Sequence, residues 1–127
     1  MANELTLTGS VTYDDAVRSA SLSVSTRQVN ITTKRPIKFV QNIGTSEEAL
    51  ELGDITPRYA MIRNLDTTNF VSFRVASGGA NAIRLSADTA GTGKGGFMIV
   101  EFGSGMTAPF LIADTAACDV EVLLVPA

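Results

Sequence analysis

Apolar and polar residues alternate with a period of two along most of this chain. In the run Val71–Val75 the odd-numbered positions are apolar and the even-numbered positions are polar, which is typical of a strand with one buried face. A second β-rich run, Arg58–Leu65, precedes it, and the polar connection Asp66–Asn69 separates the two. Residues 58–75 therefore predict a hairpin built around a single turn.

The same pattern, interrupted by glycine, proline, asparagine and aspartate, recurs from one end of the chain to the other. It predicts strands at residues 3–12, 19–33 (two short strands with a turn near Arg27), 37–43, 83–86, 97–102, 109–113 and 118–125, besides the hairpin. Phe97–Phe102 is apolar on both faces and is predicted to be a central strand. About nine or ten short strands at such regular spacing predict an all-β, single-domain antiparallel β-sandwich with a jelly-roll-like topology.

One segment, Thr45–Gly53, fits two structures. Thr45 with Glu48 matches a helix capping box, and Gly53 matches a helix stop. Alternatively, Leu50 and Leu52 point inward from a strand. We favour the strand because the segment is too short to form a stable helix alone.

The 127 residues correspond to one domain, 1–127. Residues 1–35 are rich in serine and threonine, so they are a candidate N-terminal arm or an edge-strand region that another subunit completes. The start of the chain lacks the pattern of a signal peptide, and no apolar run is long enough to cross a bilayer. We therefore expect a protein made in a cytoplasm, with no membrane partner.

Charged residues make up only 18% of the chain, and the net charge is −3. No basic excess exists to attract phosphates, so nucleic acid is not an expected partner. The one basic cluster is Lys34 and Arg35 with Lys38. It is interpreted as a solvated strand face or an edge guard, with contact to an acidic protein surface as the alternative.

Histidine is absent and cysteine occurs once, at position 118. This composition argues against a zinc site and against Ser-His or Cys-His nucleophilic catalysis. Cys118 shares a predicted strand face with Val120, Val122 and Leu124, so it is expected to be a small buried hydrophobe. No catalytic, cofactor-binding or metal-binding residues are predicted, and the protein is not expected to be an enzyme.

The segment Gly91–Gly96 resembles a phosphate-binding loop only superficially. A P-loop requires glycine five positions before its Gly-Lys pair and a hydroxyl residue after the lysine, whereas this chain has Asp88 and Gly95 there. A surface loop that contacts a protein partner fits better. By the same reasoning about exposed loops and termini, the predicted protein-interface residues are Lys34, Arg35, Asp66, Thr67, Thr68, Asn69, Gly91, Thr92, Gly93 and Lys94. The alternatives for these segments are a frayed terminus, a tight turn and a mobile loop.

Three segments carry a resemblance to a known class of proteins. Asn42–Ile55 contains the run GTSEEALELGD, residues 62–71 contain NLDTTNFV, and residues 113–123 read ADTAACDVEVL. They resemble a pattern of small virion proteins of tailed bacteriophages, in which a G-T-x-E-E-x-L-x-L-G-D run precedes an N-L-D-x-T-N-(Y/F)-V hairpin. The resemblance covers roughly residues 42–125; the loop at 88–96 has no counterpart in the pattern, and residues 1–35 match nothing.

The resemblance implies a virion structural protein, and within that class a capsid decoration (cement) protein. Its implied partner is the major capsid protein of the same virion, its implied location is the capsid surface after synthesis in the host bacterial cytoplasm, and a homo-oligomer is expected, with a trimer favoured. The alternative function is a tail or fibre-associated β-sandwich module that binds a host surface glycan or receptor. A sandwich-fold hydrolase that works with carboxylates alone is the third hypothesis.

Overall fold

The computed structural model describes residues 4–30, 35–81, 83–103 and 108–126. All regular elements in these ranges are β-strands, and every pair of neighbouring strands is antiparallel. The all-β antiparallel class predicted from the sequence is therefore confirmed. Contacts divide the chain into two compact units, Met1–Lys34 and Arg35–Ala127. In the described ranges no helix is long and apolar enough to cross a membrane.

The first unit is a long two-stranded hairpin, β1 (Glu4–Asp14) and β2 (Ser19–Asn30). Asp15 closes its turn, because one carboxylate oxygen accepts hydrogen bonds from the backbone N–H groups of Val17 and Arg18, both at 2.7 Å. The other oxygen accepts a bond from the hydroxyl of Tyr13 at 2.6 Å. These bonds lower the pKa of the Asp15 carboxyl, the Tyr13 bond contributing most.

The prediction of two short strands within residues 19–33 was wrong for its described part. Residues 19–30 form one strand, and the register shifts in its middle: Leu7 lies opposite Arg27, whereas Gly9 lies opposite Val24. The β2 strand thus has one residue more than β1 over this interval, which is a β-bulge. The bulge moves the alternating side chains of β2 to the opposite faces of the hairpin, and this change of phase explains why the sequence pattern predicts a turn near Arg27.

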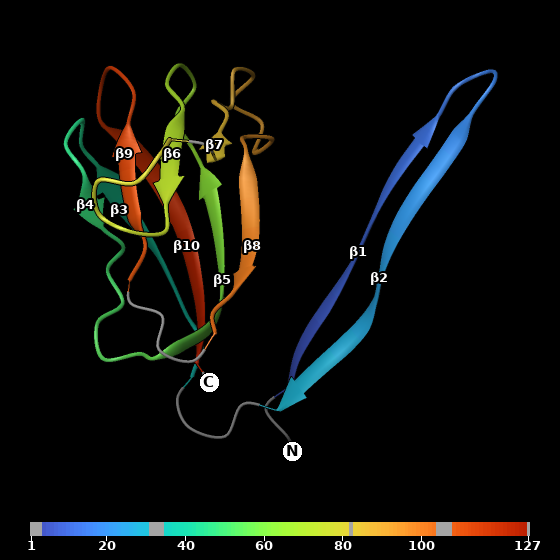
Figure 1. The fold of residues 1–127 in the computed structure, drawn as a ribbon, viewed down its shortest axis with the longest axis horizontal. Coiled ribbons are helices and arrows are strands. Elements are labelled where there is room, and N and C mark those ends of the chain that lie inside the picture. Colours follow the sequence, from blue (N-terminus) through green and yellow to red (C-terminus); the bar gives the residue numbers. More distant parts are fainter. Residues whose placement is uncertain (1–3, 31–34, 82, 104–107, 127) are drawn as a thin grey trace. The chain divides into compact units, whose positions relative to one another are not determined.

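The second unit is a β-sandwich of two four-stranded sheets. The first sheet has the order β3 (Ile37–Ile43), β10 (Cys118–Pro126), β5 (Pro57–Asn64), β8 (Phe97–Glu101). The second has the order β4 (Glu48–Ala49), β9 (Phe110–Ala113), β6 (Val71–Arg74), β7 (Ile83–Leu85). Figure 1 shows the two layers, with β9 and β6 in front of β10 and β5.

The strand pairs of the sandwich are nested along the chain. β6 pairs with β7, β5 with β8, β4 with β9 and β3 with β10, as if one long hairpin had been rolled up into two sheets. The β-sandwich is thus established, and the jelly-roll-like topology stays a prediction.

The core lies between the two sheets and consists of the inward positions of each strand. Cys118, Val120, Val122 and Leu124 on β10 are fully buried, so the predicted inward face of that strand is confirmed. They pack in one cluster with residues such as Ile43, Ile62, Val71, Phe73 and Leu111. Burial of this kind is the main favourable contribution to folding.

The hairpin predicted for residues 58–75 was wrong. β5 and β6 belong to different sheets, and each pairs with two other strands: β5 with β10 and β8, β6 with β9 and β7. The connection 65–70 carries the chain across the core, a distance of about 10 Å for packed sheets. Local alternation identifies both strands correctly but contains no information about their partners. Val75, predicted to share the inward face, lies beyond the end of β6 and is 65% exposed.

The prediction that Phe97–Phe102 forms a central strand was also wrong. β8 is at the edge of its sheet, beside β5. Met98 and Val100 pack against the core, but Phe97 and Ile99 are 62% and 52% exposed. The outward apolar residues that suggested a central position are therefore exposed in the single chain.

For Thr45–Gly53 the favoured strand is confirmed in a shortened form. Glu48 and Ala49 form the two-residue strand β4, Leu50 is buried and Leu52 half-buried. No helix forms here. The Glu48 carboxylate accepts a hydrogen bond from the backbone N–H of Gly44 at 2.5 Å, one residue before Thr45, the predicted helix cap.

Candidate protein-interaction site

Four connections meet at one end of the sandwich, and we call this surface the loop end. It consists of residues 44–47, 65–70, 86–96 and 114–117, which follow β3, β5, β7 and β9 (Figure 1). Backbone hydrogen bonds join the connections directly. Asp88 N–H donates to the carbonyl of Asp66 at 2.7 Å, Asp114 N–H donates to that of Phe70 at 3.1 Å, and Ala113 N–H to that of Gly44 at 2.9 Å.

The turn Asp66–Asn69 is shaped by the carboxylate of Asp66. One of its oxygens accepts the backbone N–H groups of Asn69 at 2.5 Å and Thr68 at 2.8 Å, which is the usual role of aspartate in a turn. These bonds lower the pKa of Asp66, the Asn69 bond contributing most. Thr67 and Thr68 are exposed at the tip, so they are the residues of this turn that are open to a partner.

Asn69 faces inward. It is 9% exposed, its side-chain oxygen accepts a hydrogen bond from the hydroxyl of Thr115 at 2.6 Å, and its backbone carbonyl accepts one from the Asn64 amide at 2.8 Å. The residue ties the 65–70 connection to the 114–117 connection and to β5. The Asn69 side chain therefore stabilises the loop end from its buried side.

The glycine-rich loop is held by a buried carboxylate. Asp88, 5% exposed, accepts the backbone N–H groups of Gly93 at 2.6 Å and Thr92 at 3.2 Å. Gly91 and Gly93 have φ of 62° and 77°, in the left-handed region that glycine enters without a steric penalty. Residues 91–94 are all exposed, and Gly91 lies beside Thr67. The two predicted interface segments thus form one surface.

Of the two remaining predicted interface residues, the structure describes Arg35, which does not join this surface. Arg35 is exposed, and because β3 runs towards the loop end, Arg35 precedes the strand at the opposite end of the sandwich. Lys34 lies outside the described residues. Lys38 forms an ion pair with Glu121 at 3.5 Å on the outer face of the first sheet.

The first sheet has an outer apolar face that the sequence analysis did not identify as a surface. It consists of Val40, Met61, Phe97, Ile99 and Leu123. By register, Ile99 lies beside Met61 and Met61 beside Leu123, which gives an apolar row across three strands. In the next row the ion pair of Arg63 and Glu121, 2.6 Å apart, separates Phe97 from Val40.

Three observations on the described residues concern metal binding, thiol reactivity and sugar stacking. In the four described ranges, no group of three or more His, Cys, Asp or Glu side chains is placed to hold a metal ion. Cys118 is fully buried, and burial, followed by the nearby carboxylates, raises its pKa to about 11, so its thiol is protonated at neutral pH and is a poor nucleophile. Tyr59 is only 4% exposed, so its ring offers little surface on which a sugar could stack.

A network of hydrogen bonds and an ion pair holds the connection between β6 and β7. This connection folds back across the outside of the second sheet towards β4 (Figure 1). The centre of the network is the carboxylate of Glu47. It accepts hydrogen bonds from the hydroxyl of Ser77 at 2.5 Å and the N–H of Gly78 at 2.9 Å, and forms an ion pair with Arg74. These contacts, the Ser77 bond first and Arg74 second, lower the pKa of Glu47 from 4.5 to about 2.

The lowered pKa predicts a loss of stability in acid. The unfolded chain binds the proton of Glu47 more tightly than the folded chain does, so the contribution of Glu47 is complete above pH 4.5 and is lost as the pH falls towards about 2. We expect the urea midpoint of the wild type to fall more steeply over this interval than that of Glu47→Gln. Glu51→Gln, which removes an exposed carboxylate, is the matched control and should keep the wild-type slope. Parallel pH profiles for wild type and Glu47→Gln would contradict the assignment.

Comparisons of the chain with protein-family models, with curated proteins and with solved structures found no match. The assignment of a function therefore depends on the residues and on the geometry described above.

Proposed function

We propose that this chain is a structural protein of a tailed-bacteriophage virion, specifically a capsid decoration protein that reinforces the head shell through protein–protein contacts. The proposal starts from the resemblance of residues 42–55, 62–71 and 113–123 to small virion proteins. The observation that carries it is that these three segments, far apart in sequence, contact one another at the loop end. Gly44, Phe70 and residues 113–114 join them through backbone hydrogen bonds.

The composition of the loop end suits a partner that is a folded protein. Thr67, Thr68 and residues 91–94 are exposed, and Lys94 supplies their only charge. Internal hydrogen bonds to Asp66 and Asp88 shape both loops in advance, so binding costs less conformational entropy. Many copies of such a modest contact, arranged by the symmetry of a shell, give firm attachment.

The test is binding of the purified full chain to expanded heads that lack it. We expect the chain to co-sediment with the heads and to raise their melting temperature, because a ligand that binds only the folded shell stabilises it. Failure of the wild type to bind heads, or binding to host cells or glycans with no effect on heads, would overturn the proposal in favour of the tail or fibre module.

A pair of matched variants tests whether the loop end makes the contact. Thr67→Arg places a large cation at the tip of the 65–70 turn, whereas Thr56→Arg places the same side chain in the exposed connection before β5, at the opposite end of the sandwich. We expect Thr67→Arg to weaken head binding at least about tenfold, since a buried unpaired charge costs several kcal/mol at an interface. Thr56→Arg should bind as the wild type does. Equal binding by both variants would place the contact elsewhere.

A further inference from the structure

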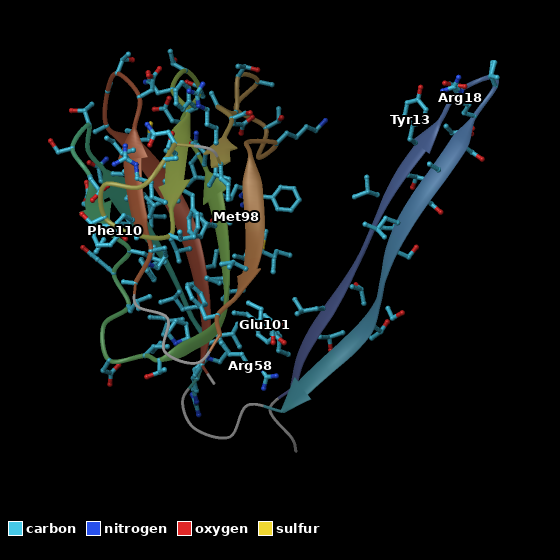
Figure 2. All side chains as sticks on the ribbon, viewed as in Figure 1. Tyr13, Arg18, Arg58, Met98, Glu101 and Phe110 are labelled. Carbon is cyan, nitrogen blue, oxygen red and sulfur yellow. The ribbon has the colours of Figure 1, made fainter. Side chains whose placement is uncertain are left out.

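The N-terminal hairpin has one apolar face and one polar face, and its apolar side chains are exposed. Leu5, Leu7, Val11 and Tyr13 occupy alternate positions on one face of β1, and Leu22 lies opposite Val11. We call this the hairpin apolar face. Its opposite face carries threonine and serine, for example Thr12 paired with Ser21. Val11, Tyr13 and Leu22 are 73%, 58% and 71% exposed; Tyr13 is labelled near the turn in Figure 2.

An isolated two-stranded hairpin is at best marginally stable in water, because it needs a third strand or a packed face to bury its apolar side. The two strands of the hairpin have eleven and twelve residues, so its apolar face is long. Its exposed apolar stripe is also of the kind that marks an interaction surface.

The sandwich has a surface that fits such a stripe. The outer apolar face presents Phe97 and Ile99, 62% and 52% exposed, beside the half-buried Met61 and Leu123, with Val40 at its far side, 55% exposed. Both surfaces are antiparallel sheet faces with apolar side chains, and two such faces pack about 10 Å apart in sandwiches.

We propose that the hairpin apolar face of one copy packs on the outer apolar face of a second copy. The two surfaces differ, so the contact is heterologous, and each chain carries one of each kind. Copies can then associate head to tail until the assembly closes.

The areas involved also favour a closed assembly. An eleven-residue hairpin is about 36 Å long and about 10 Å wide, so one face offers roughly 350 Å². A stable interface needs about 800 Å² from each partner. A chain that both gives its hairpin and receives another buries roughly twice the area of one face, but in two contacts. Both contacts lie in one interface, and so approach this requirement, only when two copies exchange hairpins reciprocally. The same reasoning disfavours an open pair with one contact.

The first test measures the molar mass of the full chain by sedimentation equilibrium over a concentration series, with no heads present, so that its result is independent of the proposed function. The wild type should form a closed oligomer. Val11→Ser/Leu22→Ser and Phe97→Ser/Ile99→Ser should each weaken association at least about tenfold, since buried apolar anchors dominate such interfaces. All four residues are exposed in the single chain, so the sandwich should fold, and circular dichroism checks this.

Thr12→Ser/Ser21→Thr alters the polar face of the hairpin and is the matched control; it should keep the wild-type mass. A monomeric wild type overturns the proposal, as does dissociation by only one of the two apolar-face variants.

A second test captures the contact directly. Chains carrying Leu22→Cys and chains carrying Ile99→Cys, with different tags, are mixed and mildly oxidised. A disulfide-linked heterodimer is expected, and replacing Leu22→Cys by Thr12→Cys should abolish it. If a single chain carrying both Leu22→Cys and Ile99→Cys yields only internally linked monomer, the hairpin covers its own sandwich and the proposal fails.

Discussion

Gly96→Ala is expected to lower the free energy of unfolding of the sandwich by about 3 kcal/mol or more, a size typical of severe overpacking. A methyl group at Gly96 would lie 2.2 Å from the backbone nitrogen of Ser86 and 2.7 Å from the carbonyl carbon of Leu85. Both are main-chain atoms, so no side chain can move aside. Gly96 also donates to the carbonyl of Ser86 and accepts from the N–H of Asn64, both at 2.9 Å, and a shift of its backbone would break these bonds.

Gly103→Ala is the matched control. Among the residues that the structure describes, the same methyl group there meets nothing within 4 Å, and Gly103 does not have a positive φ. Urea or thermal unfolding of both variants is the measurement, and the melting temperature of Gly96→Ala should fall by more than about 10 °C, since 1 kcal/mol corresponds to several degrees in a domain of this size. Equal stability of the two variants would show that Gly96 does not hold the loop against β7.

The glycine-rich loop that contains Gly96 shows which features the sequence could predict and which it could not. The run Gly91–Gly96 correctly indicated a surface loop, since residues 91–94 are exposed. The sequence does not show that the glycines have two different roles. Gly91 and Gly93 supply positive φ, whereas Gly95 and Gly96 permit close backbone contact with Asn64 and Ser86. This second role depends on which strands are neighbours.

Strand positions and inward faces could be predicted because they depend on local alternation. Cys118, Val120, Val122 and Leu124 are buried as expected. Strand partners could not be predicted in the same way, because every β-rich run has the same local pattern whichever strand lies beside it. For this reason β5 and β6 were assigned to one hairpin, and the edge strand β8 was placed at the centre.

At the candidate site, too, local features could be predicted from the sequence, whereas features that depend on strand pairing could not. Exposure of Thr67, Thr68 and residues 91–94 followed from turn residues and glycine content. Their proximity results from the pairing of β5 with β8 and of β6 with β7, which brings the two connections together. The outer apolar face was missed because Phe97 and Ile99 are apolar, and apolar residues on both faces of a strand normally indicate burial. Because β8 is an edge strand, these two side chains are exposed, and their exposure indicates an interaction surface.

Asn64→Asp is expected to destabilise the sandwich by about 4 kcal/mol or more, because it would place a carboxylate in a site lined by acceptors. Asn64 is fully buried at the end of β5. Its side-chain nitrogen donates to the carbonyls of Asn69, Leu85 and Ser86 at 2.8, 3.1 and 3.2 Å. It therefore joins β5 of the first sheet to the end of β7 in the second. Aspartate has no N–H to donate, and its charge would face three carbonyl oxygens.

The sign of the pH dependence distinguishes this mechanism from simple loss of packing. A buried carboxyl among acceptors has its pKa raised on folding, so Asn64→Asp should be least stable at high pH and should recover part of its stability as the pH falls and the carboxyl becomes protonated. Asn81→Asp is the control: Asn81 is exposed and its side-chain oxygen accepts a hydrogen bond from Arg74 at 2.5 Å, so a carboxylate there keeps an acceptor beside a cation. Urea unfolding at neutral and mildly acidic pH should show a large, pH-dependent loss for Asn64→Asp and little change for Asn81→Asp. A pH-independent loss would mean that the site lacks the acceptors that define it, and the role of Asn64 as a link between the sheets would have to be abandoned.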